Sequence, residues 1–567
     1  MTGTSQSTGD QAVMSHVELP EPGREVKVKD AIATERNNSN SNSNSNSVDH
    51  MMAPTKQLSL LESIRTYKYA TIICILAAVG ALSDGYQVQM SGSIVAEPGF
   101  IRQFGDLQSD GTYKIDPQYI SLWGSLKNVF AMLGAGIGSY PADKFGRQWM
   151  ICLVQIIMVG GCILEQLATH WTHWLGARFL DGFSIGLAQC CINVYISEMA
   201  PTPCRGSLMS LMQLFYSIGS FLSAISLNIV SQDRPSNWRH AVLSQFVFCG
   251  VALFAWYFLP ESIRWLCMTG REAQAKKIMT KVYRGVEGYN VDIEYERLML
   301  EIEKSRATAS IQGEGTYFDI FRGTNLRRLV ISFLPWHWQV AIGVPIISTY
   351  SSYFFDMAGL ANPFNGTVAT NVVTIVMLFI AVPLVERLGR RTLLLWFAPI
   401  CIASLLIIGG VLRSDGPPVG PVLITFACTW SIGYNLSTGP MGYIYVAETA
   451  TTRLRAKTTG VAIIFIQGMA TVYVYIAPIM LNSPALGMSN TVFFWVGTGT
   501  LVYFLVWFLV PETKGRSFGE LDELFERKIP AWRFAQTKTS VDEYFSQDSR
   551  VKTTEASDLI YEYMYFT

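Results

Sequence analysis

The stretches "PADKFGRQ" (141–148) and "LVERLGRR" (384–391) are two copies of one short motif. Each copy holds an acid, a glycine and an arginine in the same order, and each lies between two long apolar runs. A charged turn motif that recurs in this way indicates a chain built from two similar halves.

Two further motifs recur at matching places. The segment "YISEMAPTPCRG" (195–206) corresponds to "YVAETATTRLRAK" (445–457). The segment "PESIRWL" (260–266) corresponds to "PETKGRSFGELDE" (511–523). Three motifs that each occur twice in the same order predict an internal duplication.

Between these motifs the chain consists mainly of long apolar runs. Each is close to or above the roughly 20 residues that a helix needs to cross a bilayer, and short alternating barrel strands are absent. We therefore predict an all-α integral membrane protein with twelve transmembrane helices, in two six-helix bundles. The predicted spans are 68–92, 118–140, 149–169, 174–197, 207–231, 240–259, 327–356, 367–385, 392–412, 419–446, 457–481 and 490–510.

The composition agrees with a membrane protein. Half of the 567 residues are hydrophobic and 15% are charged, and 43 basic residues balance 43 acidic ones. This balance gives no reason to expect a nucleic-acid partner. The ten cysteines lack metal-ligand spacing, so we expect small buried side chains and no metal site. No nucleophile–base pair or phosphate-binding loop suggests an enzyme.

Polar segments divide the chain further. Residues 1–66 contain an Asn/Ser tract that cannot bury enough apolar surface to order itself. No cleavable signal begins the chain, so the first span is expected to direct insertion. The predicted parts are a disordered tail (1–66), an N-terminal bundle (67–259), a linker of short amphipathic helices (260–325), a C-terminal bundle (326–510) and a C-terminal tail (511–567).

Basic residues set the expected orientation. Lysine and arginine concentrate in the joints after the even-numbered spans, so the positive-inside rule places both termini, the linker and both tails in the cytoplasm. Asn365 then lies outside, in an Asn-Gly-Thr sequence that accepts N-linked glycans.

The repeated motifs also place acids beside the arginines, although acids contribute little to topology. We interpret these charges as a cytoplasmic latch that pairs across helices in one conformation and separates in another; charges that serve topology alone are the alternative. Gly146 and Gly389 would permit the tight turns between helices. The predicted latch residues are Asp143, Arg147, Glu198, Arg205, Glu386, Arg390, Arg391, Glu448, Arg453 and Arg455.

Together with "ARFLDGFSIG" (177–186) and "GPMGYIYVAE" (439–448), these motifs resemble the sugar porter family of the major facilitator superfamily. The resemblance covers roughly residues 67 to 530. The segments "YSSYFFDMAGL" (350–360) and "PETKGRSFGELDELFERKIPAWRF" (511–534) are similar to fungal α-glucoside (maltose) and hexose permeases.

This resemblance implies two bundles around a central cavity that opens to each side in turn. It implies transport of a sugar or sugar-like polyol, commonly with a proton as coupling ion and with no other cofactor. We expect a monomer in the lipid bilayer, most naturally in the plasma membrane, with a small-molecule substrate.

Ionisable groups within the predicted spans are functional hypotheses, because lipid solvates them poorly. They are Asp84, Lys127, Arg178, Asp181 and His337. Depth estimates at 1.5 Å per residue put Asp84 and Arg178 at similar levels, so one hypothesis is an ion pair that proton uptake on Asp84 releases. The alternative pairs Asp84 with Lys127.

Where proton-coupled sugar porters have a pattern like "GYD", this chain has "GYQ" (85–87). The maltose-type pattern is closer to "EGYD", and its first acid matches Asp84. We predict that Asp84 carries the proton and that Gln87 hydrogen-bonds the substrate. In the alternative, the missing acid ends coupling and Asp84 is a permanent structural ion in a facilitator.

The family pattern also gives candidate substrate contacts. Matching it residue by residue gives Gln213 and Gln339, two tyrosines at the outer gate of the seventh span (Tyr350 and Tyr353), and Tyr443 in the place where many sugar porters hold tryptophan.

Two other functions remain open. Val340, Pro345 and Tyr443 depart from the residues typical of sugar porters, and Lys127, Arg178 and His337 would suit an anion. The second hypothesis is therefore an organic acid such as quinate, or a fungal secondary metabolite. A non-transporting nutrient receptor is the third hypothesis, but such receptors carry long cytoplasmic tails and only about 57 residues follow the last span.

Overall fold

The structure is a computed structural model that describes residues 60–539, with gaps at 110, 202–203, 287–288, 312–316, 414–418, 452–453, 515 and 517. Most of the predicted N-terminal tail and the last part of the predicted C-terminal tail lie outside the described residues.

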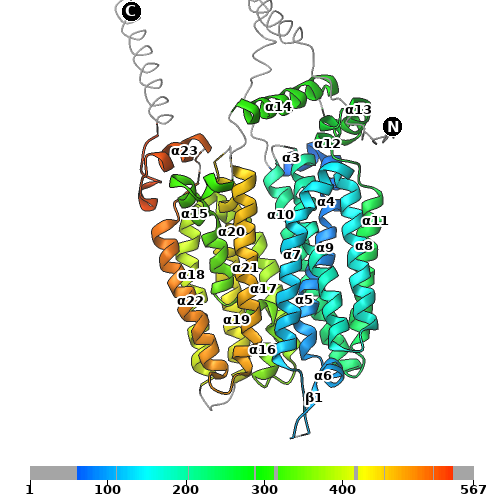
Figure 1. The fold of residues 1–567 in the computed structure, drawn as a ribbon, viewed down its shortest axis with the longest axis vertical. Helices are drawn as coiled ribbons and strands as arrows, with labels where there is room; N and C mark the ends of the chain where they lie inside the picture. Colours follow the sequence, from blue (N-terminus) through cyan, green and yellow to red (C-terminus); the bar gives the residue numbers. More distant parts are fainter. Residues whose placement is uncertain are drawn as a thin grey trace, which may run out of the picture. The chain divides into compact units, whose positions relative to one another are not determined.

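The first half is a group of long helices (Figure 1). Its first span consists of α4, α5 and the short helix η1, and the connection that follows holds α6 and the two-stranded antiparallel sheet β1–β2. The elements are α3 (Leu60–Thr66), α4 (Lys68–Ala78), α5 (Gly80–Ser93), η1 (Ile94–Ala96), α6 (Pro98–Phe104), β1 (Asp106–Leu107), β2 (Tyr113–Lys114), α7 (Pro117–Phe145), α8 (Arg147–Leu167), α9 (Trp171–Met199), α10 (Arg205–Asp233) and α11 (Arg239–Tyr257).

Three shorter helices and a 3-10 turn follow at one end of the molecule, and they occupy most of the predicted linker. They are α12 (Ile263–Met268), α13 (Glu272–Val282), α14 (Val291–Ile311) and η3 (Tyr317–Phe321). The end that carries α13 is called the linker end below, and the end that carries β1 and β2 is called the hairpin end.

The second half repeats the long helices and adds a short helix at the linker end. Its elements are α15 (Gly323–Ala341), η4 (Pro345–Thr349), α16 (Ser351–Met357), α17 (Pro363–Leu388), α18 (Arg390–Val411), α19 (Val419–Leu436), α20 (Thr438–Thr449), α21 (Arg455–Asn482), α22 (Gly487–Leu509), α23 (Phe518–Glu526) and η5 (Ala531–Arg533).

Local sequence explains where equivalent helices begin. The second and eighth spans, α7 and α17, each start with proline at the first helical position, where its missing N–H costs no helical hydrogen bond. The preceding Asp116 accepts a hydrogen bond from the N–H of Gln118 at 2.8 Å, and Asn362 accepts one from Phe364 at 3.0 Å. Both are side-chain caps of a helix N-terminus.

Eleven helices within the described residues are long and apolar enough to cross a membrane. The predicted seventh span (327–356) is instead divided into α15, η4 and α16. Gly343 interrupts it with φ of 100°, and Pro345 cannot donate a backbone hydrogen bond. The predicted tenth span is likewise divided into α19 and α20 at Ser437. The all-α membrane fold is confirmed, with eleven helices of membrane-spanning length and a seventh span in three parts.

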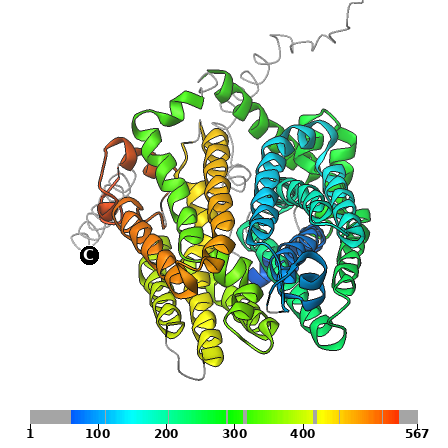
Figure 2. The same cartoon turned by 60° about the horizontal axis from the view of Figure 1, so that its bottom comes forward.

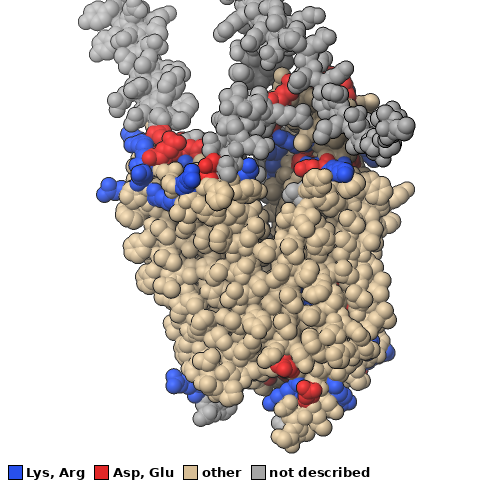
Figure 3. Space-filling view, in the orientation of Figure 1, with Lys and Arg blue, Asp and Glu red and all other residues tan. Residues whose placement is uncertain are grey.

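The two halves meet along two pairs of helices. In the first half α7 packs against α9, and it also packs against α21 of the second half. Similarly α10 packs against α5 and against α17. Figure 2 shows the two groups of helices side by side. Lysine, arginine and acidic side chains gather at the two ends of the visible surface, and the band between them is almost free of charge (Figure 3), as expected for a surface that faces lipid.

Candidate functional site

A central cavity of about 230 Å³ lies between the two halves. Residues of α5, α7, α9 and α10 line one side, and residues of α15, η4 and α21 line the other. Polar groups, including Lys127, Asn128, Arg178, Gln189 and Gln467, alternate with aromatic side chains, including Trp123, Trp336 and Tyr350. The cavity predicted between two bundles is therefore present.

Arg178 is the centre of a buried charge cluster beside this cavity. Its guanidinium contacts the carboxylate of Glu165, and its Nη2 lies 3.1 Å from Oδ2 of Asp181. All three side chains are at most 1% exposed. The Trp174 ring centroid lies 4.6 Å from the guanidinium carbon, a distance typical of a cation–π contact.

Two amides complete the surroundings of Glu165. Gln87 donates to Oε1 and Gln245 donates to Oε2, each at 2.7 Å. In this structure Gln87 therefore binds a carboxylate, and it is not among the residues that line the cavity. Its role as a substrate contact stays a prediction.

Neither pairing considered for Asp84 is present. Arg178 pairs with Glu165 and Asp181, while Nζ of Lys127 donates to Oγ of Ser91 at 2.8 Å. Asp84 is 4% exposed, and its Oδ1 has no hydrogen-bond partner among the described residues. Within the described residues, the first half thus buries one acid without an ion pair, Asp84, and another that is paired, Glu165.

The predicted substrate contacts fall in different places. Tyr350 lines the cavity and donates from its hydroxyl to the carbonyl of Ile120 at 3.3 Å, a bond between the two halves. Gln339 donates to the carbonyl oxygens of Thr438 and Gly439 at 2.7 and 3.0 Å, next to the break between α19 and α20.

Tyr353 and Gln213 are not among the described residues that line the cavity. The hydroxyl of Tyr353 accepts a hydrogen bond from Nδ2 of Asn482 at 2.6 Å. Gln213 is exposed on α10. Tyr443 lies in α20, but its side chain is outside the described residues.

Sequence reasoning missed Glu165 and the amides Gln189, Gln245 and Gln467. Glu165 is an acid inside the predicted third span, so the criterion that selected Asp84 would also have selected it. The amides carry a weaker signal, because an amide in a span is costly only when it lacks a partner, and a sequence does not reveal partners.

Three predicted latch residues of the first half are paired at the linker end. The Arg147 guanidinium lies 2.9 Å from Asp143 and 3.2 Å from Glu198. The backbone N–H groups of Arg147 and Gln148 donate to Oε1 of Glu261 at 2.9 and 3.1 Å. A carboxylate at the start of α8 suits the positive end of the helix dipole. Burial nevertheless raises the pKa of Glu261, although these N–H donors and Arg147 oppose the rise.

The second half repeats this arrangement. Arg390 lies 3.3 Å from Glu448, and the backbone N–H groups of Arg390 and Arg391 each donate to Glu512 at 3.0 Å. The Arg391 guanidinium donates to the carbonyls of Val510 and Trp507 at 2.6 and 2.7 Å.

Both turns depend on glycine. Gly146 and Gly389 have φ of 101° and 95°, so the prediction that they permit the tight turns is confirmed. Each pair described above joins helices within one half. Arg205 is exposed, and the side chains of Glu386, Arg453 and Arg455 lie outside the described residues.

At the hairpin end, hydrogen bonds join the two halves. Nδ2 of Asn228 on α10 donates to Oδ1 of Asn365 at 3.0 Å, and Nδ2 of Asn362 donates to Oδ1 of Asn228 at 2.8 Å. Thr367 of the glycan-acceptor sequence is fully buried and hydrogen-bonded to Ser352 at 2.8 Å. Glycosylation of Asn365 stays a prediction.

Comparison with known proteins gives a consistent picture. Residues 73–525 match the family model described as "Sugar (and other) transporter". A general alpha-glucoside permease of Saccharomyces cerevisiae is 27% identical over 525 residues, which cover 88% of this chain and 84% of the permease. Hexose transporter 2 of Kluyveromyces lactis is 26% identical over 515 residues, which cover 86% of this chain and 87% of that protein.

Solved structures share the fold. The inward-open conformation of the xylose transporter XylE from E. coli matches with a TM-score of 0.66 at 20% identity, and covers 80% of this chain and 99% of that chain. XylE bound to 6-bromo-6-deoxy-D-glucose, described as a proton:xylose symporter, matches with a TM-score of 0.64 at 21% identity, over 81% of this chain and all of that chain.

Proposed function

The chain belongs to the "Sugar (and other) transporter" family, and on that premise we propose that it moves a sugar or sugar-like polyol across a membrane by alternating access, in symport with a proton carried by Asp84. The relatives described as an alpha-glucoside permease and a hexose transporter support this substrate class. The observation that carries the proposal is a cavity between the two halves that adjoins a buried cluster of acids.

The lining of the cavity suits a sugar. A sugar presents hydroxyl edges, which need donors and acceptors, and apolar ring faces, which stack on aromatic side chains. Asn128, Gln189 and Gln467 offer amides that both donate and accept, and Trp123 and Trp336 offer aromatic faces. Amides that contact hydroxyl groups would be left unpaired by an apolar solute, which gives the site its selectivity.

The charges beside the cavity support proton coupling. Three buried carboxyl groups, Asp84, Glu165 and Asp181, accompany the two buried cations Lys127 and Arg178. If all five were ionised, one negative charge would stay uncompensated in a low-dielectric interior, which is costly. Among the described residues Asp84 has neither an ion pair nor a partner for Oδ1, so we assign the proton to it in this conformation.

Alternating access is supported by contacts at the hairpin end. The bonds of Asn228 to Asn362 and Asn365 connect α10 and α17 across the two halves. The ion pairs of Arg147 and Arg390 at the linker end act within each half. We propose that each half moves as a rigid body and that opening at the hairpin end breaks the bonds of Asn228.

A second candidate substrate is an organic acid such as quinate. Lys127 and Arg178 both line the cavity, and no aspartate or glutamate is among the described residues that do. Because Arg178 already has two carboxylate partners, Lys127 is the cation available to an anionic substrate.

Uptake into transporter-deficient yeast would test the function. Labelled maltose, glucose, xylitol and quinate are offered to cells that express the protein, at external pH 5 and 7.5. Accumulation of a sugar or polyol above its external concentration, greater at pH 5, is expected. Accumulation of quinate alone would support the second candidate, and equilibration without accumulation would support a facilitator. Uptake of none of them would favour a nutrient receptor.

We further propose a plasma-membrane location with both termini in the cytoplasm. The basic joints between the spans support this orientation. Protease added to intact cells should then leave an epitope at either terminus intact, and should cleave it only after the cells are permeabilised.

A further inference from the structure

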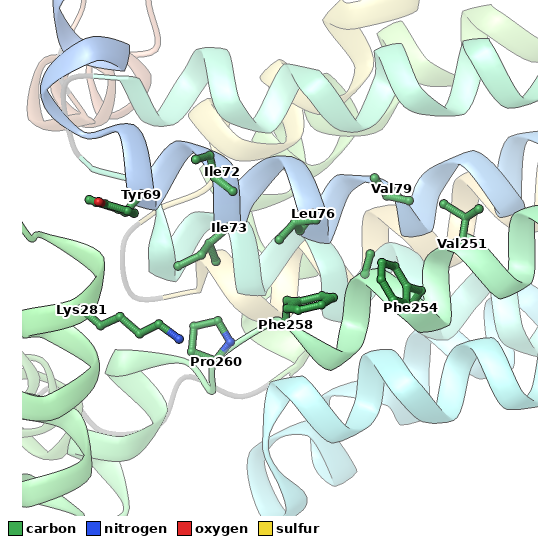
Figure 4. Close-up of a pocket in the computed structure, with 11 residues that line it drawn as sticks. Tyr69, Ile72, Ile73, Leu76, Val79, Val251, Phe254, Phe258, Pro260 and Lys281 are labelled. Atoms are coloured by element: carbon green, nitrogen blue, oxygen red, sulfur yellow. The ribbon is translucent and has the colours of Figure 1, made fainter.

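A second hollow of about 460 Å³ opens on the outside of the first half, between α4 and α11 near the linker end (Figure 4). Apolar side chains of both helices line it, among them Ile72, Leu76, Val251, Phe254 and Phe258. None of its lining residues lines the central cavity, so this groove, named the α4–α11 groove here, is separate from the proposed transport site.

The α4–α11 groove belongs to the membrane-facing surface. Ile72, Phe254 and Phe258 are 51%, 69% and 50% exposed, and both helices lie within continuous membrane spans. Exposed apolar side chains at that position meet lipid chains rather than water. A concave apolar surface between two spans therefore offers packing contacts to an acyl chain from both sides.

One positively charged side chain lies at the linker end of the groove. Lys281, in the last turn of α13, extends toward Pro260 at the mouth of the groove (Figure 4). It is exposed and forms no ion pair with the described residues, whereas Lys276 on the same helix lies 2.7 Å from both Glu272 and Asp292. No carboxylate is among the described residues that line the groove.

A second lysine lies at the start of α4. Lys68 is the first residue of α4, it is exposed, and its Nζ lies 5.4 Å from the ring centroid of Tyr69, which lines the groove. The groove thus has an apolar floor in the span and a basic rim where the span ends. An anionic lipid has an acyl chain inside the bilayer and a negatively charged headgroup at its surface. The apolar floor of the groove suits the chain, and the basic rim suits the headgroup.

We propose that the α4–α11 groove binds an anionic glycerophospholipid, with an acyl chain between the two helices and the phosphate against Lys281. A zwitterionic lipid offers the same chains, but its headgroup carries no net charge to complement the unpaired lysine. An acyl chain gains no hydrophobic energy by leaving the bilayer for the groove, so the charge at the rim selects the lipid and the shape of the groove fixes its position.

Native mass spectrometry of the full-length protein in detergent would test this. The protein is titrated with phosphatidylglycerol and, separately, with phosphatidylcholine of the same acyl chains. We expect tighter binding of phosphatidylglycerol. Lys281→Ala should weaken it about fivefold, which corresponds to the roughly 1 kcal/mol expected per lysine near a lipid headgroup, and should leave phosphatidylcholine unchanged.

Three further variants make the result specific. Lys277 is exposed one turn earlier on α13 and does not line the groove, so Lys277→Ala should leave binding unchanged. Ile72→Trp fills the groove from its exposed side and should weaken both lipids. Lys281→Arg keeps the charge and should retain phosphatidylglycerol binding, so it shows whether the position tolerates substitution.

Three outcomes would overturn the proposal. Equal affinity for the two lipids would show that the groove does not prefer anionic lipids. Equal losses in Lys277→Ala and Lys281→Ala would indicate a diffuse attraction to the basic surface of α13. Unchanged lipid binding in Ile72→Trp would show that no chain occupies the groove.

Discussion

The carboxylate of Glu165 contacts the guanidinium of Arg178 in the interior of the first half, where neither side chain is more than 1% exposed. Gln87 and Gln245 donate to the same carboxylate, so α5, α8, α9 and α11 are joined through one acid. A buried ion pair whose acid also accepts two hydrogen bonds fixes geometry, because losing one member leaves the other charged and unsolvated.

Glu165→Gln should therefore destabilise the protein. Arg178 would keep only Asp181 as a charged partner, and breaking a buried pair by removing one member costs about 3–5 kcal/mol. Thermal unfolding of the purified variant measures the loss. Glu301→Gln is the control, since Glu301 pairs with Arg264 at an exposed site where a pair contributes at most about 1 kcal/mol. Equal unfolding temperatures of the two variants would show that the Glu165 pair does not stabilise the fold.

Asp84→Asn should abolish proton coupling without lowering the stability of the protein. Since Asp84 forms no ion pair within the described residues, replacing it with a neutral isostere should change the unfolding temperature little. It should abolish the extra accumulation at pH 5 while exchange of labelled substrate across the membrane continues. Asp84→Glu keeps a carboxyl group and should retain part of the accumulation. If Asp84→Asn accumulated as much substrate as the parent protein, the proton would be carried by another group, and Glu165 would be the next candidate.

Glu261 and Glu512 should have matching effects, because each caps the start of the helix that follows a glycine turn. Glu261 accepts hydrogen bonds from backbone N–H groups of α8, and Glu512 accepts them from backbone N–H groups of α18. We expect Glu261→Ala and Glu512→Ala each to lower stability by about 1–2 kcal/mol, because the backbone N–H groups at the start of the helix lose their acceptor. Chemical denaturation of the two purified variants measures this. A loss confined to one variant would mean that the two turns are not equivalent in energy.

The fold was predictable because its causes are local. Apolar runs of sufficient length specify spans, and the repeated motif around Gly146 and Gly389 specifies two equivalent turns. The broken seventh span was harder to foresee. Gly343 and Pro345 are visible in the sequence, but glycine and proline are tolerated inside membrane helices when neighbouring groups satisfy the backbone.

The contacts in the site were less predictable, because the depth of a residue in the membrane does not fix the direction in which its side chain points. Asp84 and Arg178 were placed at similar depths by counting residues, yet Arg178 contacts Glu165 and Asp181 instead. The side chains that meet depend on the rotation of each helix about its axis, which is set by packing against several neighbours at once. Gln213, which the family pattern selects, is exposed on α10, and its role as a substrate contact stays a prediction.

A final prediction concerns pH and Glu97, one residue beyond the end of the first span. Its side chain is fully buried, neither carboxylate oxygen has a hydrogen-bond partner among the described residues, and burial raises its pKa from 4.5 to about 8. Between these values the unfolded chain has released the proton while the folded chain retains it. Stability due to this group is therefore present below about pH 4.5 and is lost as the pH rises toward 8.

Glu97→Gln should remove this dependence, because the amide stays neutral in both states. The variant and the parent should unfold at similar temperatures at pH 4.5. At pH 8 the variant should unfold at the higher temperature, because the free energy of unfolding of the parent is then lower by about a few kcal/mol. Thermal unfolding of both proteins in the same detergent across this range measures the difference, with Glu301→Gln as an exposed control. A difference that stays constant or narrows as the pH rises would mean that Glu97 is ionised in the folded protein throughout, and that a charged partner compensates it.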